Sequence, residues 1–142
     1  MNKTEGRRPR LAALLALVAI FFGIVTIGVG GRVLFGGAEE RASAGNIVPF
    51  VLWFNFVAGF AYIIAGLGLF RWKRWAAQLS SVIAITTIVV LVAFGTHILL
   101  GGMFELRTIG AMIIRSTVWT VIAVLACRAL RCFQRGLSDA AV

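Results

Sequence analysis

Four long apolar stretches take up most of this chain, and only short polar segments separate them. They cover residues 11–34, 47–70, 76–100 and 108–130. A bilayer has a hydrocarbon core of about 30 Å, which a helix crosses with roughly 20 apolar residues. Backbone N–H and C=O groups in that core must bond within their own segment unless strands close into a barrel, and these stretches lack the alternating polarity of barrel strands. Each stretch is therefore predicted to be a membrane-spanning helix.

The overall composition supports the same conclusion. Hydrophobic residues make up 61% of the chain, and the mean hydropathy is +0.99. Apolar usage in soluble domains is nearer one half. The four stretches leave little chain for a soluble catalytic domain, so we predict an all-α fold. Residues 1–142 would form a single transmembrane domain, an integral membrane four-helix bundle.

The formal charge of +9 raises the question of nucleic-acid binding. The basic residues instead gather before the first stretch, between the second and third, and after the fourth: Lys3, Arg7, Arg8, Arg10, Arg71, Lys73, Arg74, Arg128, Arg131 and Arg135. Four spans place these three segments on one side, which the positive-inside rule makes cytoplasmic. We therefore predict a multi-pass protein of a bacterial inner membrane with both termini in the cytoplasm. Its partners there would be anionic lipid headgroups and not nucleic acid.

A cleaved signal peptide is an alternative interpretation of the N-terminal segment. A basic start, an apolar run and the small residues Ala42, Ser43 and Ala44 fit that pattern superficially. The apolar run is longer than the 7–15 residues usual for the core of a signal. An uncleaved first helix is the favoured interpretation.

The first stretch carries a row of small residues at spacings of three and four: Ala12, Ala16, Ala19, Gly23, Thr26 and Gly30. Small faces let helix backbones approach closely in lipid. We expect this face to pack on another helix of the same chain, with a homodimer contact as the alternative. Leu14, Leu17, Phe21 and Ile24 lie on other faces and are expected to meet lipid or neighbouring side chains.

The connecting segments carry turn and capping signals. Residues 36–46 are predicted to be a short loop, with Asn46 capping the second helix and Pro49 in its first turn. Thr108 is the predicted cap of the fourth helix. The long third stretch is expected to tilt, to extend past the bilayer, or to end early, with Gly101 and Gly102 as the predicted break. The short connection predicts that the third and fourth helices are antiparallel neighbours.

Seven polar or aromatic residues are the candidate ligand-binding residues: Arg115, His97, Asn55, Glu105, Arg107, Tyr62 and Trp119. Arg115 is the clearest of them, because ionisable groups inside a membrane are costly and often functional. It lies seven residues into the fourth stretch, which is about 10 Å of helix. From the predicted topology, the ionisable groups and Asn55 gather toward the outer side.

Two interpretations of this cluster remain open. In the first, an outward-facing pocket binds a ligand, and Arg115 offers a planar fork of donors to an anionic or carbonyl group. In the second, the cluster is a structural network that pins helices together. Arg115 would then pair with Glu105, and His97 would bond a backbone carbonyl or Asn55.

Several other chemistries lack the residues that they need. A single histidine cannot supply two haem ligands, and His97 with Glu105 is too sparse for a metal site. The helices contain no carboxylate for a proton-coupled exporter or a Ser–His–Asp set. Cys127 and Cys132 do not form a Cys-x-x-Cys motif and are expected to be reduced. The sequence therefore indicates no catalytic residue and no particular cofactor, and it favours a non-enzymatic role.

The segment AGLGLFRWKRWAA, residues 65–77, resembles the end of the second helix and the following loop of DoxX-type proteins. These are small four-helix bacterial membrane proteins, some of them linked to quinone-coupled sulfur oxidation. The carboxylate usual in their second helix is absent here, where Asn55 and Tyr62 stand instead. The resemblance thus implies an architecture and no catalytic residue.

These features support three functional hypotheses. The leading one is an accessory or ligand-binding membrane component, with a polar ligand or a partner protein held at Arg115. The second is a subunit of a small-molecule or ion transporter or channel, with the pore at the interface of a homo-oligomer. The third, implied by the DoxX resemblance, is a quinone-linked redox subunit.

Overall fold

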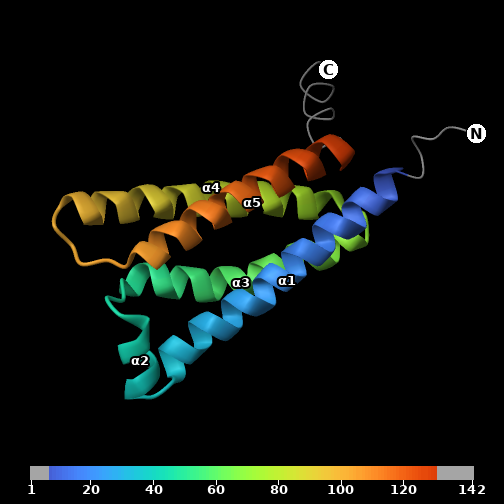
Figure 1. Cartoon of the computed structure of the whole chain (residues 1–142). Coiled ribbons are helices and arrows are strands. Elements are labelled where there is room, and N and C mark those ends of the chain that lie inside the picture. Colours follow the sequence, from blue (N-terminus) through green and yellow to red (C-terminus); the bar gives the residue numbers. More distant parts are fainter. Residues whose placement is uncertain (1–6, 131–142) are drawn as a thin grey trace, which may run out of the picture.

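The computed structural model describes residues 7–130, which form five helices. They are α1 (Arg7–Phe35), α2 (Ala38–Ala44), α3 (Pro49–Phe70), α4 (Arg74–Leu99) and α5 (Leu106–Leu130) (Figure 1). All except α2 are long and apolar enough to cross a membrane. The all-helical prediction is confirmed, and the four spans indicate a multi-pass membrane protein.

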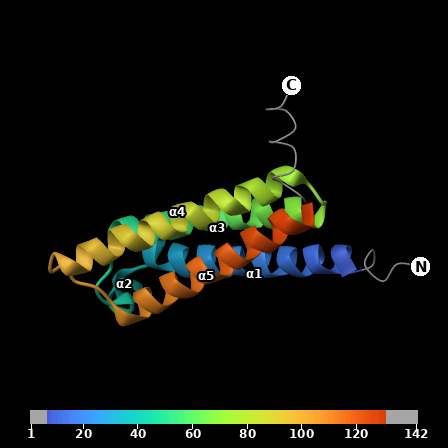
Figure 2. The ribbon, with the colours of Figure 1, turned by 90° about the horizontal axis from the view of Figure 1, so that it is seen from above.

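The four long helices run alternately up and down. The start of α1, the α3–α4 turn and the end of α5 lie at one end of the bundle, as Figures 1 and 2 show. We call this the basic end, because Arg10, Arg71, Lys73, Arg74 and Arg128 lie there. The other end, which we call the α2 end, holds α2 and the turn between α4 and α5.

The closest packing in the bundle is between α1 and α3. All six residues of the small face of α1 are buried, so this face packs within the chain as predicted. A Cβ atom added to Gly23 would lie only 2.7 Å from the carbonyl oxygen of Gly59 on α3. The two backbones therefore touch at positions where only glycine fits. Leu14, Leu17, Phe21 and Ile24 are exposed on the outside of α1, where lipid would cover them.

The rest of the core consists of two clusters. The larger one runs through the middle of the bundle toward the basic end and includes Tyr62, Trp119 and Ile122. The smaller one, at the α2 end, joins Val51 of α3 and the preceding Val48 to Phe94 of α4 and Met112 of α5. α4 packs on both α3 and α5, whereas α1 contacts α5 only lightly.

The connecting segments differ in part from the predictions. Residues 38–44 form a short helix with Glu39 and Glu40 in its first turn, where carboxylates favour a helix start. Asn46 does not cap α3; Val48 takes that position, and Pro49 follows it as predicted. The Asn46 side chain instead donates to Glu105 at 3.2 Å.

The turn between α4 and α5 agrees with the predictions at one of its ends and differs at the other. α5 begins at Leu106, so Thr108 lies inside its first turn and is not the cap. The prediction of a break after the third span is confirmed, since α4 ends at Leu99 and Gly101 adopts a φ of 84°. α4 and α5 are antiparallel neighbours, as predicted.

Candidate functional site

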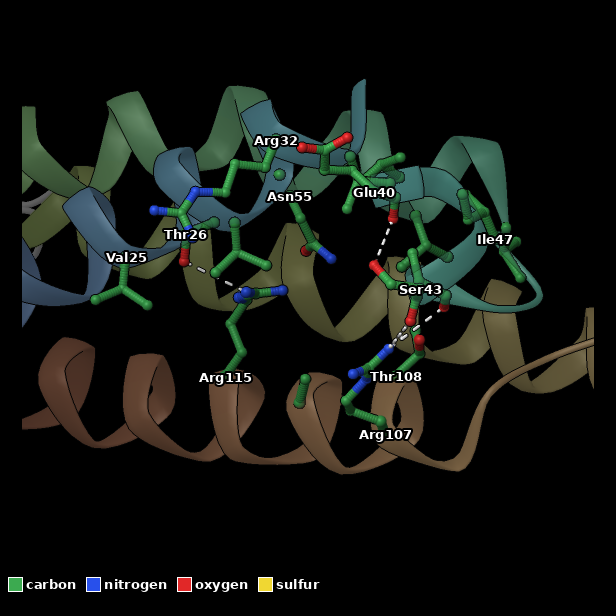
Figure 3. Close-up of a pocket in the computed structure, with 18 of the residues that line it drawn as sticks. Val25, Thr26, Arg32, Glu40, Ser43, Ile47, Asn55, Arg107, Thr108 and Arg115 are labelled. Atoms are coloured by element: carbon green, nitrogen blue, oxygen red, sulfur yellow. Dashed lines mark hydrogen bonds between the residues drawn. The ribbon is translucent and has the colours of Figure 1, made fainter. Parts of the chain in front are cut away.

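A cavity of about 730 Å³ lies at the α2 end, where α1 and α5 diverge. α3 forms its back wall, and α2 closes it at the α2 end of the bundle (Figure 3). Its lining is mostly aliphatic, with polar groups at two levels. Arg115, Thr26 and Asn55 lie at the deep level, Glu40 and Arg107 lie near α2, and the Arg32 side chain runs from α1 back toward Thr26.

Arg115 is the buried charge of this cavity. Only 9% of the residue is exposed, and its guanidinium points from α5 toward α1 (Figure 3). One terminal nitrogen donates to the Thr26 hydroxyl at 3.3 Å, and the other lies 3.7 Å from the sulfur of Met112. The Nε–H has no partner in the part of the chain that the structure describes. The guanidinium thus has one neutral oxygen partner and keeps unused donors.

The position of Arg115 follows from the face of α5 that carries it. Met112 and Trp119 lie three residues before and four residues after it, and both are fully buried. Residues at these spacings share one helix face. The face that turns into the bundle therefore takes the arginine with it, and a cation on it can reach only the interior or the cavity.

Two further candidate residues line the same cavity. Asn55 contributes from α3, and its side-chain oxygen is buried without a partner among the described residues. Arg107 lies at the start of α5 and donates to the carbonyl oxygens of Ser43 and Ala44, at 3.3 and 3.4 Å. Arg107 therefore ties α5 to the end of α2, while Asn55 leaves an acceptor free beside Arg115.

His97 and Glu105 lie outside the cavity lining. The Glu105 carboxylate accepts from the backbone N–H of Asn46 at 2.9 Å and from its side-chain amide at 3.2 Å. His97 contacts the backbone carbonyl of Met103 at 3.4 Å. The Arg115–Glu105 pair of the structural interpretation is therefore not formed, whereas its histidine–carbonyl contact is.

Tyr62 and Trp119 lie below the cavity, toward the basic end. Both are fully buried, and their rings contact each other at a tilt of 38°, with centroids 4.5 Å apart. Phe22, which lines the cavity, packs on Tyr62 at 6.5 Å. The Tyr62 hydroxyl approaches Thr87 without a well-formed hydrogen bond. Of these three rings only Phe22 lines the cavity, and Tyr62 and Trp119 belong to the larger core cluster.

Sequence reasoning did not identify Thr26, Arg32 or Glu40 as residues of the site. Thr26 carried a usable signal, because it is the one hydroxyl among the residues of α1. Arg32, near the end of α1, and Glu40 carried none, and the approach of Glu40 to the cavity depends on how α2 folds back. Lys3, Arg131, Cys132 and Arg135 lie outside the described residues, so their predicted roles stay predictions.

The chemistry that this site offers is hydrogen bonding to a ligand. No cluster of three or more His, Cys, Asp or Glu side chains that could hold a metal occurs within residues 7–130. Cys127 is buried and free, and its sulfur lies 3.5 Å from the Ser81 hydroxyl, far along α5 from Arg115.

Comparison of the chain with protein-family models, curated proteins and solved structures finds no match.

Proposed function

We propose that this protein is a non-enzymatic component of a bacterial inner membrane that binds a ligand through Arg115. The ligand would present an anionic or carbonyl group to the guanidinium, either as a small molecule or as part of a membrane-protein partner. The observation that carries this proposal is the buried guanidinium of Arg115 at a cavity of about 730 Å³, with its Nε–H unpaired among the described residues.

The energetic argument rests on what a buried cation needs. An arginine at membrane depth is costly unless it is paired or reaches water. Arg115 bonds one neutral hydroxyl and contacts one sulfur, which leaves its charge uncompensated by the described residues. An acidic group in the cavity would supply the missing acceptors in bidentate form. A residue kept for stability alone would more simply be leucine or methionine.

The proposed orientation places the α2 end outside the cell. Its support is the charge distribution, since Arg10, Arg71, Lys73, Arg74 and Arg128 share the basic end. Positive segments next to spans are retained in the cytoplasm. The cavity would then lie in the outer half of the membrane.

The two alternative functions have weaker support. A transporter or channel subunit needs a polar path along the bundle, whereas the lining of the cavity does not extend to Tyr62 and Trp119, which are buried in the apolar core. A quinone-linked subunit is compatible with the donors of the cavity, which fit a quinone carbonyl, but its other support is only the DoxX resemblance. Neither is favoured over ligand binding at Arg115.

The test is purification in mild detergent, followed by mass spectrometry of everything bound to the wild-type protein and to Arg115→Leu. We expect a small molecule or a partner protein on the wild type that is absent from Arg115→Leu. Leucine removes the guanidinium without adding a polar group, so the bundle is expected to remain folded by circular dichroism.

Arg41→Leu is the matched control. Arg41 lies on α2 at the same end of the molecule, is exposed, and donates to the Leu34 carbonyl away from the cavity lining. Its loss changes net charge equally and should leave the bound species in place. Unfolding of Arg115→Leu, or an identical set of bound species on all three proteins, would instead support the structural interpretation of Arg115.

A further inference from the structure

The cavity has an open side between α1 and α5. Val25 and Val29 of α1 and Ile114 of α5 line it and are themselves well exposed. In a chain that spans a membrane, side chains exposed at this depth face hydrocarbon. The rim of the opening is therefore aliphatic and lies against the lipid chains.

The side of the cavity that faces the membrane surface is more restricted. Arg107 bonds the carbonyl oxygens at the end of α2, and Glu105 accepts two hydrogen bonds from Asn46 just beyond α2. These contacts fasten α2 and the segment after it to the start of α5, as Figure 3 shows for Arg107 and Ser43. We call α2 and the fastened segment after it the strap. A molecule that entered from water would have to pass the strap, whereas one that entered from the lipid would not.

The polar groups inside define the headgroup that fits. Arg32, Arg107 and Arg115 line the cavity against a single carboxylate, Glu40, which gives it a formal net charge of +2. Arg115 is the most deeply buried of these charges, and its Nε–H has no partner within residues 7–130. An acidic group placed beside it would leave its hydrocarbon chain along the aliphatic residues that line the opening.

The size of the cavity limits the number of chains. Its volume of about 730 Å³ falls within the roughly 300–1,000 Å³ that is usual for sites of single small ligands. One acyl chain with a compact headgroup suits this space better than a phospholipid with two chains.

On the proposed function, which this inference takes as its premise, we propose that the ligand is a single-chain acidic amphiphile. It enters the Arg115 cavity sideways from the membrane, between α1 and α5. Its acidic group bonds Arg115, and its chain lies against Val25, Val29 and Ile114.

The test measures binding of radiolabelled palmitate to the full-length protein in nanodiscs. The key variant is Val29→Trp, which places a large side chain in the opening. Val92→Trp is the matched control, because Val92 lies on α4 away from the cavity lining and is 63% exposed, against 61% for Val29. We expect saturable binding to the wild type and to Val92→Trp, a tenfold or greater loss in Val29→Trp, and no measurable binding to Arg115→Leu.

Competition identifies the ligand class. We expect unlabelled palmitate to displace the label, and butyrate, inorganic phosphate, a two-chain phosphatidylglycerol and a neutral quinone with a long side chain to be at least tenfold less effective. Equal displacement by butyrate or phosphate, with Arg115 still required, would overturn the amphiphile and leave the proposed function intact. Preferential binding of phosphatidylglycerol or of the quinone would likewise overturn this ligand class alone.

Two further outcomes separate the inference from its premise. Unchanged palmitate binding by Val29→Trp would overturn the sideways route while Arg115 remained the binding group. Failure of every one of these probes to bind the wild-type protein would overturn the amphiphile. The co-purification experiment on Arg115→Leu would then decide alone whether Arg115 binds any ligand.

Discussion

α1 meets its two neighbours in opposite ways. Against α3 it packs at the level of backbone, with Gly23 and Gly59 in contact over a face from which larger side chains are excluded. Against α5 it diverges, and the cavity fills the space between them. The first contact is made mainly by glycine and apolar side chains, and its one buried hydroxyl, that of Tyr62, is neutral. The second holds a guanidinium whose charge no described residue compensates. The close packing of α1 therefore lies toward α3, and the proposed ligand site lies toward α5.

The same row of small residues contributes to both regions. Toward the basic end, Ala16 and Ala19 are fully buried in the core. Toward the α2 end, Thr26 and Gly30 also line the cavity. Small residues permit close approach where a partner helix is present, and where the helices splay they leave open space. A single sequence pattern thus produces a tight contact at one level and borders a cavity at another.

The largest effect is expected from Gly23→Leu, which disrupts the close contact between α1 and α3. A Cβ atom at this position would lie 2.7 Å from the Gly59 carbonyl oxygen and 2.7 Å from Cγ1 of Ile63. Backbone cannot move aside as a flexible side chain can. We expect a loss of at least about 3 kcal/mol in the free energy of unfolding, the upper end of the range for overpacking. The measurement is unfolding by denaturant titration in detergent.

Gly28→Leu is the control within the same helix. A Cβ atom on Gly28 would meet nothing within 4 Å, so the change in stability should stay within about 0.5 kcal/mol, as for other exposed positions. Equal effects of the two substitutions would contradict the account of the α1–α3 contact. Glycine would then act through its backbone freedom and not through close approach.

The sequence predicted the α1–α3 contact better than it predicted the cavity between α1 and α5. The row from Ala12 to Gly30 has a fixed period, so it predicted a buried face without knowledge of the partner helix. The four spans followed from length and apolarity alone. Both signals are local, and both depend on a regular helix in lipid.

The open side could not be predicted in detail because its contacts are not local. Arg115 was recognisable as a deep cation, but its bond to Thr26 joins positions 89 residues apart. Asn46 was predicted to cap a helix, but its side chain donates to Glu105, which is 59 residues away. The short helix α2 was missed because seven polar and small residues have no apolar period. The point at which two helices diverge depends on the packing of the whole bundle. The spacing of residues in the sequence does not indicate it.

An intermediate effect is expected from Glu105→Ala, which loosens the strap at the α2 end. The substitution removes the acceptor for both the backbone and the side-chain N–H of Asn46. Because this carboxylate is half-exposed, we expect a loss of only about 1 kcal/mol, below the range for buried charged hydrogen bonds. The loss should appear as faster amide hydrogen exchange in residues 38–48, with the α1–α3 contact unchanged. Equal acceleration across α1 and α3 would show that the strap supports the whole bundle.

The smallest effect is expected from Thr26→Val, which tests whether the two sides of α1 are energetically separate. Valine keeps the shape of threonine but cannot accept the hydrogen bond from Arg115 at 3.3 Å. Interhelical hydrogen bonds in membranes average about 0.6 kcal/mol, so stability should fall by no more than that, and palmitate affinity should change by about threefold. Thr117→Val is the control, since Thr117 is exposed and bonds only the Ile113 carbonyl of its own helix. A loss of stability as large as that of Gly23→Leu would mean that the guanidinium, and not the glycine contact, holds α1 in the bundle.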